Sequence, residues 1–429
     1  MSSVAAVPRN TGVLFIGRVV AQGLAVVLTV VLAARLGVSG FGEYALVSAV
    51  VFLANVATTF GTDMVLIREV AGHARLDRWV AAFAVQLALS VIAIVAIWLV
   101  APVIPGQGGH VVTALRIMSL TLLPAALFSV CTAVLRGVGM MAAYAALGVG
   151  AAAVQLGAVV IFVGPGSDVV RVAAVLLGAQ VLIGIGAWAM CVARIGDVRA
   201  VPRLSRFEVG AMARASASIG VLGLLGVAYQ RVAAIAVSVL VGPAATGWFA
   251  GASRIVEASK TGHLALFGAV YPAMAEASAD EQSDERHRAV LHWSWRLCVV
   301  LGGVVTAGLL LLGPFLIEWL YGPAFAPSEV ALAILALAVV PSTVATYQSL
   351  SLLAAHREAD NLRVLGASLA VLLVALAALI PTIGWRGGCW AVVIADTTQA
   401  GLMLLARANL DRRPQSISPL VSNLQQGTR

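Results

Sequence analysis

Long apolar runs recur along the whole chain and are separated by short polar segments. A helix needs about 20 mostly apolar residues to cross a bilayer, and the runs predict about twelve such spans. The predicted spans cover 11–34, 42–67, 79–100, 111–135, 141–163, 171–193, 214–240, 245–270, 293–319, 326–353, 362–380 and 387–407. The runs are continuous rather than alternating, which excludes the period-two pattern of a membrane barrel. The pattern therefore predicts an all-α polytopic membrane protein.

Composition agrees with this class, because 61% of the residues are hydrophobic, 11% are charged and the mean hydropathy is +1.00. These values are far from those of soluble domains. The first apolar run is long and lacks a small-residue cleavage site, so we expect no cleaved signal peptide. The four cysteines stand singly in apolar spans. We therefore expect neither a disulfide framework nor a metal site, and no cofactor.

The arginines outside the spans fall mostly into alternate loops, and this distribution sets the orientation. Lys and Arg are enriched in cytoplasmic loops. One set of loops and tails contains Arg9, Arg68, Arg75, Arg78, Arg136, Arg194, Arg199, Arg203, Arg206, Arg286, Arg288, Arg357, Arg363, Arg412, Arg413 and Arg429. The other set contains Arg35, Arg171 and Arg386. Both termini are therefore expected in the cytoplasm, and the net charge of +8 is explained by a basic face beside anionic lipid rather than by a nucleic-acid partner.

Two stretches of the first half recur in the second. The segment Ala114–Pro124 matches Ala331–Pro341 at an offset of 217 residues, and Gly37 and Gly42 match Gly242 and Gly247 at an offset of 205. Chance similarity in an Ala/Leu-rich chain is the alternative to duplication. A duplicated set of six spans predicts two six-helix lobes around a central cleft, related by an axis along the membrane normal. The lobes would be residues 1–205 and 206–407, followed by a flexible cytoplasmic tail, 408–429.

Charged residues inside the spans are the candidate functional residues, because a charge in hydrocarbon is costly and usually marks a ligand or ion path. The cations are Arg18, Arg116, Arg231, Arg254 and Lys260, and the acidic residues at comparable positions are Asp63, Glu257 and Asp396. The excess of cations predicts a cleft that binds an anionic cargo. It also predicts substrate-binding roles for all five cations.

Spacing adds detail to these candidates. Arg254, Glu257 and Lys260 repeat every three residues, so neighbours can pair along one side of a helix. An internally neutralised set of packing charges is the alternative for Glu257 and one neighbour. Glu257 and Asp396 are also candidates to carry a coupling proton or cation.

The remaining charges have competing explanations. Arg18 and Gln22 are four residues apart and share a helix face that is expected to point into the cleft. Arg116 lies near the outer end of its span, where a snorkelling side chain is the alternative. Asp63 lies one turn from the cytoplasmic end of its span, where it would cap the helix or be solvated.

Enzymatic chemistry is not expected. The outer loops are short and the six histidines are dispersed, so no acid/base set converges. The GxxxxGK[ST] pattern of ATP-binding loops is absent, which argues against direct use of ATP.

Several motifs resemble bacterial polysaccharide transporters, the O-antigen and capsule oligosaccharide flippases. In the first half these are Ala34-Arg35-Leu36-Gly37, Gly42-Glu43-Tyr44, Gly61 and Arg68-Glu69. In the second half they are Gly242, Gly247-Trp248-Phe249, Tyr271-Pro272-Ala273-Met274, Leu320-Tyr321-Gly322 and Phe325. That family belongs to the multidrug, oligosaccharidyl-lipid and polysaccharide (MOP) exporter superfamily, and the resemblance implies two six-helix lobes around a cavity in the bacterial cytoplasmic membrane.

The resemblance implies a flippase that moves a polyprenyl-pyrophosphate-linked oligosaccharide outward by alternating access. Its partners would be that glycan, membrane lipids and other polysaccharide-assembly proteins. The pyrophosphate agrees with the cationic cleft. Two alternatives remain: a multidrug or small-molecule exporter of the same superfamily, and a non-transporting membrane component of a glycan-assembly complex.

Overall fold

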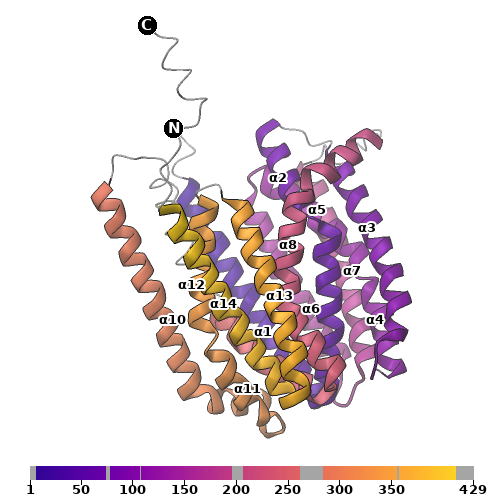
Figure 1. Cartoon of the computed structure of the whole chain (residues 1–429). Helices are drawn as coiled ribbons and strands as arrows, with labels where there is room; N and C mark the ends of the chain where they lie inside the picture. The colour runs from indigo at the N-terminus through magenta and orange to yellow at the C-terminus, as the bar shows by residue number, and fades with distance from the viewer. Residues whose placement is uncertain are drawn as a thin grey trace.

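The computed structural model describes residues 6–73, 78–106, 108–195, 206–260, 284–354 and 357–411. These residues form a bundle of helices (Figure 1). The helices are α1 Ala6–Thr59, α2 Thr62–His73, α3 Arg78–Val100, η1 Ala101–Val103, α4 Gly109–Ser119, α5 Leu122–Gly137, α6 Met141–Phe162, α7 Val169–Ile195, α8 Arg206–Leu240, a helical segment over 243–260, α10 Asp284–Tyr321, η3 Pro323–Phe325, α11 Pro327–Ala336, α12 Val339–Ala354, α13 Glu358–Ile383 and α14 Trp385–Asp411.

Helix α1 contains the first predicted span and most of the second, whose last residues lie in α2. Its 54 residues are interrupted at Gly37, where φ is 68° and ψ is −176°, so two helices meet there at a sharp kink. Positive φ is strained for residues with a Cβ atom, which explains a glycine at this position. The apolar stretch Gly12–Gly72 has 61 residues, about three times the length of one crossing. It therefore accommodates both crossings.

The other predicted spans also correspond to helices. Within the described residues, nine helices are long and apolar enough to cross a membrane, or ten if α11 and α12, which bend by 41° at their junction, form one span. The eighth predicted span corresponds to the segment 243–260, and its predicted end at residue 270 lies outside the described residues. The prediction of an all-α polytopic membrane protein with about twelve helices is confirmed for the described residues.

A broken span occurs at matching places in the two halves. Helix α4 ends before Leu120, at φ −64° and ψ −18°, and α11 ends before Leu337, at φ −64° and ψ −23°. In both cases the next helix begins two residues later and has a proline at its third position, Pro124 or Pro341. The offset of 217 residues found in the sequence therefore relates two breaks of the same geometry.

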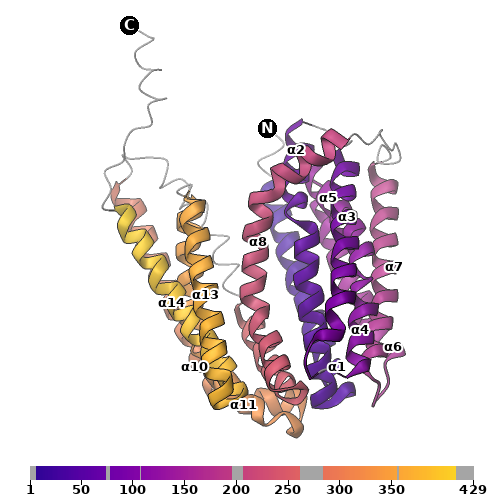
Figure 2. The same cartoon turned by 45° about the vertical axis from the view of Figure 1, so that its right-hand side comes forward.

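Helix α8 lies between two groups of helices. Figure 2 shows α10, α13 and α14 on one side and α1 to α7 on the other, and α8 packs against α1, α2 and α3 as well as against α13 and α14. The predicted lobe boundary at residues 205 and 206 falls where 196–205 lie outside the described residues. Of the predicted tail, 408–411 belong to α14, and 412–429 lie outside the described residues.

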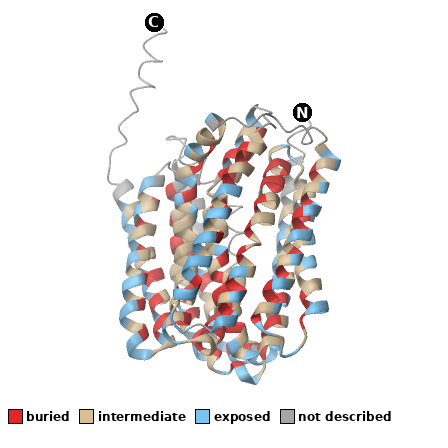
Figure 3. Ribbon diagram, turned by 90° about the vertical axis from the view of Figure 1, so that its right-hand side faces the viewer, coloured by how far each residue is buried: buried red, intermediate tan, exposed pale blue. Residues whose placement is uncertain are grey.

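The outward surface of the bundle is apolar. Figure 3 shows exposed residues along the outer sides of the helices. Among them, Leu311 is 80% exposed, Trp319 is 72% exposed and Val374 is 70% exposed. Large apolar side chains exposed in such numbers are expected only where lipid replaces water as the surrounding medium.

Helix α1 begins and α14 ends at the same end of the bundle (Figure 2). We call the opposite end, which contains Gly37, Gly242 and Gly322, the turn end. At the turn end the two halves touch backbone to backbone. A Cβ atom on Gly42 would lie 1.8 Å from the carbonyl oxygen of Pro243, and one on Gly247 would lie 2.2 Å from the carbonyl oxygen of Val38.

These two contacts are equivalent under the sequence repeat. Val38 and Gly42 correspond to Pro243 and Gly247 at the offset of 205 residues, so each half presents the same glycine to the same carbonyl of the other. This reciprocity is the signature of a two-fold relation between the halves. We refer to the four residues as the glycine joint.

Aromatic rings pack beside the glycine joint. The ring of Phe41 lies 5.9 Å from that of Phe325 in an edge-on arrangement and 6.3 Å from that of Tyr321. Phe41 and Phe325 are fully buried. The halves are thus in close contact at the turn end.

Candidate functional site: a charged cavity between the helices

A cavity of about 570 Å³ lies on the terminal side of the glycine joint. Its walls come from α1, α8, the segment 243–260, α11, α12, α13 and α14, so both halves of the chain contribute. Besides charged residues, the wall carries amides, hydroxyls and aromatic rings. These are Gln22, Phe41, Tyr44, Ser48, Tyr229, Gln230, Phe249, Ser253, Ser342, Thr343, Thr346, Ser349 and Gln399.

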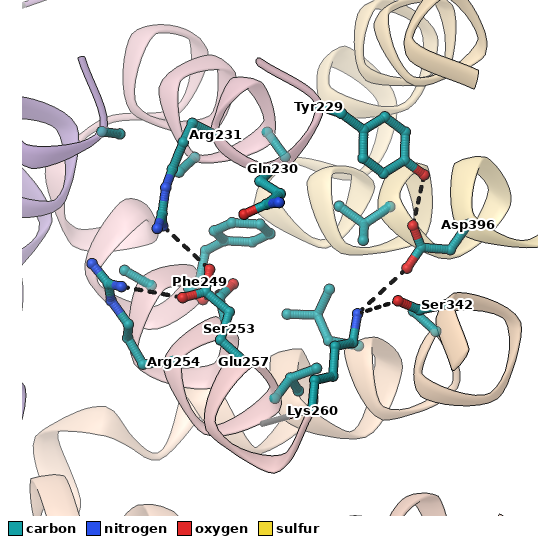
Figure 4. A pocket seen from close by; sticks show the side chains of 18 of the residues that line it. Tyr229, Gln230, Arg231, Phe249, Ser253, Arg254, Glu257, Lys260, Ser342 and Asp396 are labelled. Atoms are coloured by element: carbon teal, nitrogen blue, oxygen red, sulfur yellow. Dashed lines mark hydrogen bonds and ion pairs between the residues drawn. The ribbon is translucent and has the colours of Figure 1, made fainter. Parts of the chain in front are cut away.

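Two arginines in the wall share one carboxylate. Arg231 of α8 donates to Glu257 Oε1 at 3.2 Å, and Arg254 donates to Glu257 Oε2 at 3.1 Å (Figure 4). The guanidinium of Arg231 also lies 4.8 Å from the ring centre of Phe52, in a cation–π contact. These contacts hold both guanidinium groups in place at the cavity wall.

A second charged cluster lies across the cavity. Lys260 donates to Ser342 Oγ at 2.9 Å, and its Nζ lies 3.7 Å from Asp396 Oδ2. The hydroxyl of Tyr229 donates to Asp396 Oδ1 at 2.6 Å. Figure 4 shows this cluster opposite the arginine pair. Asp396 is therefore held by side chains from α8 and from the segment 243–260 at once.

The charge balance of the cavity is positive. Its described residues include three cations, Arg231, Arg254 and Lys260, and two carboxylates, Glu257 and Asp396, which leaves one positive charge in excess among them. Guanidinium groups bind phosphate through paired N–H donors, and charge interactions are strong where water is scarce. The arrangement can bind a ligand that joins an anionic group to a hydroxyl-rich, partly apolar body.

The structure brings together five of the seven charged residues predicted as site candidates: Arg231, Arg254, Lys260, Glu257 and Asp396. Arg254 and Glu257 pair as their spacing predicts, whereas Lys260 turns to Asp396 and Ser342.

Arg18 and Arg116 do not line this cavity. Arg18 is exposed, although Gln22, four residues further along α1, is part of the wall. Arg116 is exposed on α4. Binding roles for these two residues stay predictions.

Two residues of the second cluster were not among the predicted site residues, namely Tyr229 and Ser342. Tyr229 could have been found, because Tyr229, Gln230 and Arg231 form a run of three polar-tipped side chains in an otherwise apolar span. No sequence signal distinguishes Ser342 from the many other span hydroxyls. Its role depends on the packing of α12 against α14.

No metal centre is evident in the part of the chain that the structure describes. Within it, no three or more His, Cys, Asp and Glu side chains gather as ligands of an ion would. The four cysteines are buried and unpaired as disulfides.

Comparisons with known proteins agree with this architecture. Residues 7–278, more than half of the chain, match the family described as polysaccharide biosynthesis protein. Comparison with curated proteins gives no significant match.

Solved structures of MOP superfamily transporters share the fold. An inward-facing multidrug resistance MATE family transporter of this superfamily is similar over 92% of this chain and 94% of its own, with 17% identity and a TM-score of 0.73. The lipid II flippase MurJ in an inward closed conformation is similar over 92% of this chain and 87% of its own, with 11% identity and a TM-score of 0.74. A MOP superfamily transporter from Pyrococcus furiosus, described by the reverse polarity of its binding pocket, covers 95% of both chains at 16% identity and a TM-score of 0.67.

At these identities the structural likeness establishes the fold, and the family match establishes the relationship. The chain therefore belongs to the polysaccharide biosynthesis protein family and is a multi-pass membrane protein with the fold of MOP superfamily transporters.

Proposed function

We propose that this protein moves a polyprenyl-diphosphate-linked oligosaccharide across the bacterial cytoplasmic membrane, from the inner to the outer leaflet. The observation that carries the proposal is the pair Arg231 and Arg254, held at a cavity wall within apolar helices. Two fixed guanidinium groups on the same carboxylate match the two phosphates of a diphosphate.

The uncharged part of the cavity supports a glycan as the group attached to that diphosphate. Serine, threonine and amide side chains supply donors and acceptors for sugar hydroxyls. Tyr44 and Phe249 supply ring faces. A lipid tail would stay outside, in the bilayer that the exposed apolar helix surfaces contact.

Transport would proceed by alternating access between two lobes, residues 1–205 and 206–407. Opening at one end would separate the glycine joint, while the opposite ends of the lobes approach each other. The distribution of arginines predicts that the termini lie in the cytoplasm, and on that prediction the present arrangement, closed at the turn end, would face inward. The family match and the likeness to a lipid II flippase support this proposal.

The first experiment is mass spectrometry of polyprenyl-linked glycans in a strain that lacks the gene, compared with the strain carrying it. We expect one completed lipid-linked oligosaccharide to accumulate while its surface polymer is lost. An unchanged lipid-linked pool together with an unchanged surface polymer would refute the proposal in a strain that encodes no second flippase.

Variants of the arginines test the site itself. Arg231→Ala and Arg254→Ala each remove a charge-assisted contact of about 1.5–3 kcal/mol, so the affinity for undecaprenyl diphosphate should fall about 10–150-fold. Arg214→Ala is the matched control, because Arg214 is an exposed arginine outside the cavity on α8, the helix that carries Arg231. Equal affinity in wild type and both arginine variants would remove this pair from the site.

A multidrug exporter of the same superfamily is the second candidate. The accessible carboxylate of Glu257 and the rings of Tyr44 and Phe249 would suit a cationic aromatic compound. The excess positive charge of the cavity disfavours it. A changed drug-sensitivity profile with normal lipid-linked glycans in the deletion strain would favour this candidate.

A non-transporting role in glycan assembly makes a different prediction. Such a scaffold would retain its function when both arginines are replaced. Loss of surface polymer in the double variant, with normal membrane insertion, separates transport from scaffolding.

A further inference from the structure

The two members of the Lys260–Asp396 pair differ in how much of each side chain is exposed. The side chain of Asp396 is 5% exposed, whereas that of Lys260 is 33% exposed. A ligand in the cavity therefore reaches the ammonium group but not the carboxylate. Lys260 is the accessible half of an otherwise buried ion pair.

The contact between the two is also the loosest in the cluster. Lys260 Nζ lies 3.7 Å from Asp396 Oδ2 but 2.9 Å from Ser342 Oγ. The lysine side chain has four rotatable bonds, and its ammonium group can turn toward an anion. Asp396 is fixed more firmly, by the 2.6 Å hydrogen bond from Tyr229.

Among the residues that the structure describes, the surroundings of Asp396 offer no other cation in reach. The groups facing it are Tyr229 from α8, Lys260 from the segment 243–260 and Ser342 from α12. The helices α11 and α13 line the cavity with Leu335 and Leu365. Arg231 and Arg254 contact Glu257 on the other side (Figure 4). If Lys260 leaves, Asp396 keeps a hydroxyl but no counter-charge.

We infer that binding of an anion at Lys260 is accompanied by uptake of one proton at Asp396. An isolated carboxylate in an apolar interior is too costly to stay charged, so it becomes neutral. The proton is taken up from the surrounding solution, where the acid form of the buffer gives it up and becomes its conjugate base, and it forms an O–H bond at Oδ2, the oxygen that faced the ammonium. Lys260 stays protonated throughout and exchanges one anionic partner for another.

This linkage would give the transporter a way to carry its cargo with less net charge. Each diphosphate brought into the cavity would be compensated by the proton on Asp396 as well as by the arginines. The inference rests on the proposed diphosphate cargo. Lys260 would link the binding of that cargo to the protonation of Asp396, a residue that the cargo does not contact.

Calorimetry with the full-length protein in lipid nanodiscs tests the inference. Undecaprenyl diphosphate is titrated in buffers of different ionisation enthalpy, which yields the number of protons taken up per ligand. Wild type should take up about one proton more than Asp396→Asn, because the asparagine cannot be protonated. Because wild type and Asp396→Asn are compared at the same pH, any protons that the ligand itself gains or loses cancel in the difference.

Two further variants complete the design. Asp360→Asn is the matched control, because Asp360 pairs with Arg357 and Arg363 at the start of α13, away from the cavity, and it should behave as wild type. Lys260→Gln should also lose the linked proton, because Asp396 then lacks its cation before the ligand arrives. This variant keeps the test decisive if Asp396→Asn does not fold.

The outcomes separate the two proposals. Equal proton uptake in wild type, Asp396→Asn and Lys260→Gln, with the diphosphate bound in each, would overturn the linkage and leave the proposed function intact. Failure of the wild type to bind the diphosphate would overturn both.

Discussion

Replacing Gly42 by alanine places a methyl group where the carbonyl oxygen of Pro243 lies. The new Cβ atom would be 1.8 Å from that oxygen and 2.8 Å from the backbone nitrogen of Gly247. Non-bonded carbon and oxygen atoms attract best near 3.5 Å, so the two segments must separate by about 1.7 Å at this point. Both neighbours are backbone atoms, and no rotation of a side chain can relieve the clash.

This separation would weaken the glycine joint, the contact that closes the turn end. Forcing an extra methyl group into a packed interface costs about 1–3 kcal/mol. If that energy falls only on the closed arrangement, the ratio of closed to open molecules decreases about 5–150-fold. Gly247→Ala should have the same effect, because its Cβ atom would lie 2.2 Å from the carbonyl oxygen of Val38. Two substitutions far apart in sequence should thus give one result.

Spin-label distance measurements between the halves at the turn end would detect the change. Val103 of η1 and Thr382 of α13 are exposed and can be replaced by labelled cysteines, after the four native cysteines are replaced. Both alanine variants should show a longer distance in addition to that of the closed arrangement. Gly303→Ala is the control, because a Cβ atom there meets nothing within 4 Å. Unchanged distances and unchanged thermal stability in both variants would refute the reasoning.

Three further substitutions test other contacts. Glu257→Gln should tighten binding of undecaprenyl diphosphate about 3–10-fold at low salt, since the carboxylate no longer competes for the two arginines, and the gain should shrink at high salt in the same binding assay. Tyr229→Phe should lower stability by about 1–3 kcal/mol, because Asp396 loses a buried hydrogen bond, and unchanged thermal unfolding would contradict this. Arg35→Ala should lower stability by about 1–2 kcal/mol without changing ligand affinity, because Arg35 donates to the carbonyls of Val159 and Val160 at the end of α6; a change in affinity with full stability would contradict it.

The spans could be predicted because a bilayer imposes a fixed length of apolar residues on every crossing. Glycine positions also indicated where one crossing ends and the next begins. Gly37 and Gly242 both have positive φ, at 68° and 116°, and both precede a new crossing. The reciprocal contact of Gly42 and Gly247 could not be predicted, although their register was visible. A repeat shows which residues are equivalent, but not that equivalent residues touch.

The charged cavity was only partly predictable. The pairing of Arg254 with Glu257 follows from a spacing of three on one helix. The contact of Arg231 with Glu257 joins residues 26 positions apart on different helices and depends on tertiary packing. Arg18 illustrates a further limit. It shares a face with Gln22 but lies about 6 Å further along the axis, beyond the part of α1 that borders the cavity.

The two halves have the same architecture but not the same chemistry. All five charged residues of the cavity wall belong to the second half of the chain. At the offset of 205 residues, Arg254 and Glu257 correspond to Ala49 and Phe52.

Ala49 is part of the cavity wall, and Phe52 supplies the ring beside Arg231. Among the described residues, the first half therefore offers an uncharged surface against which the charges of the second half are held. An anionic group bound by these charges would move with the second half when the glycine joint opens. The joint can then be symmetric while the binding site is not, because opening requires equivalent contacts to break together and binding requires only one charged wall.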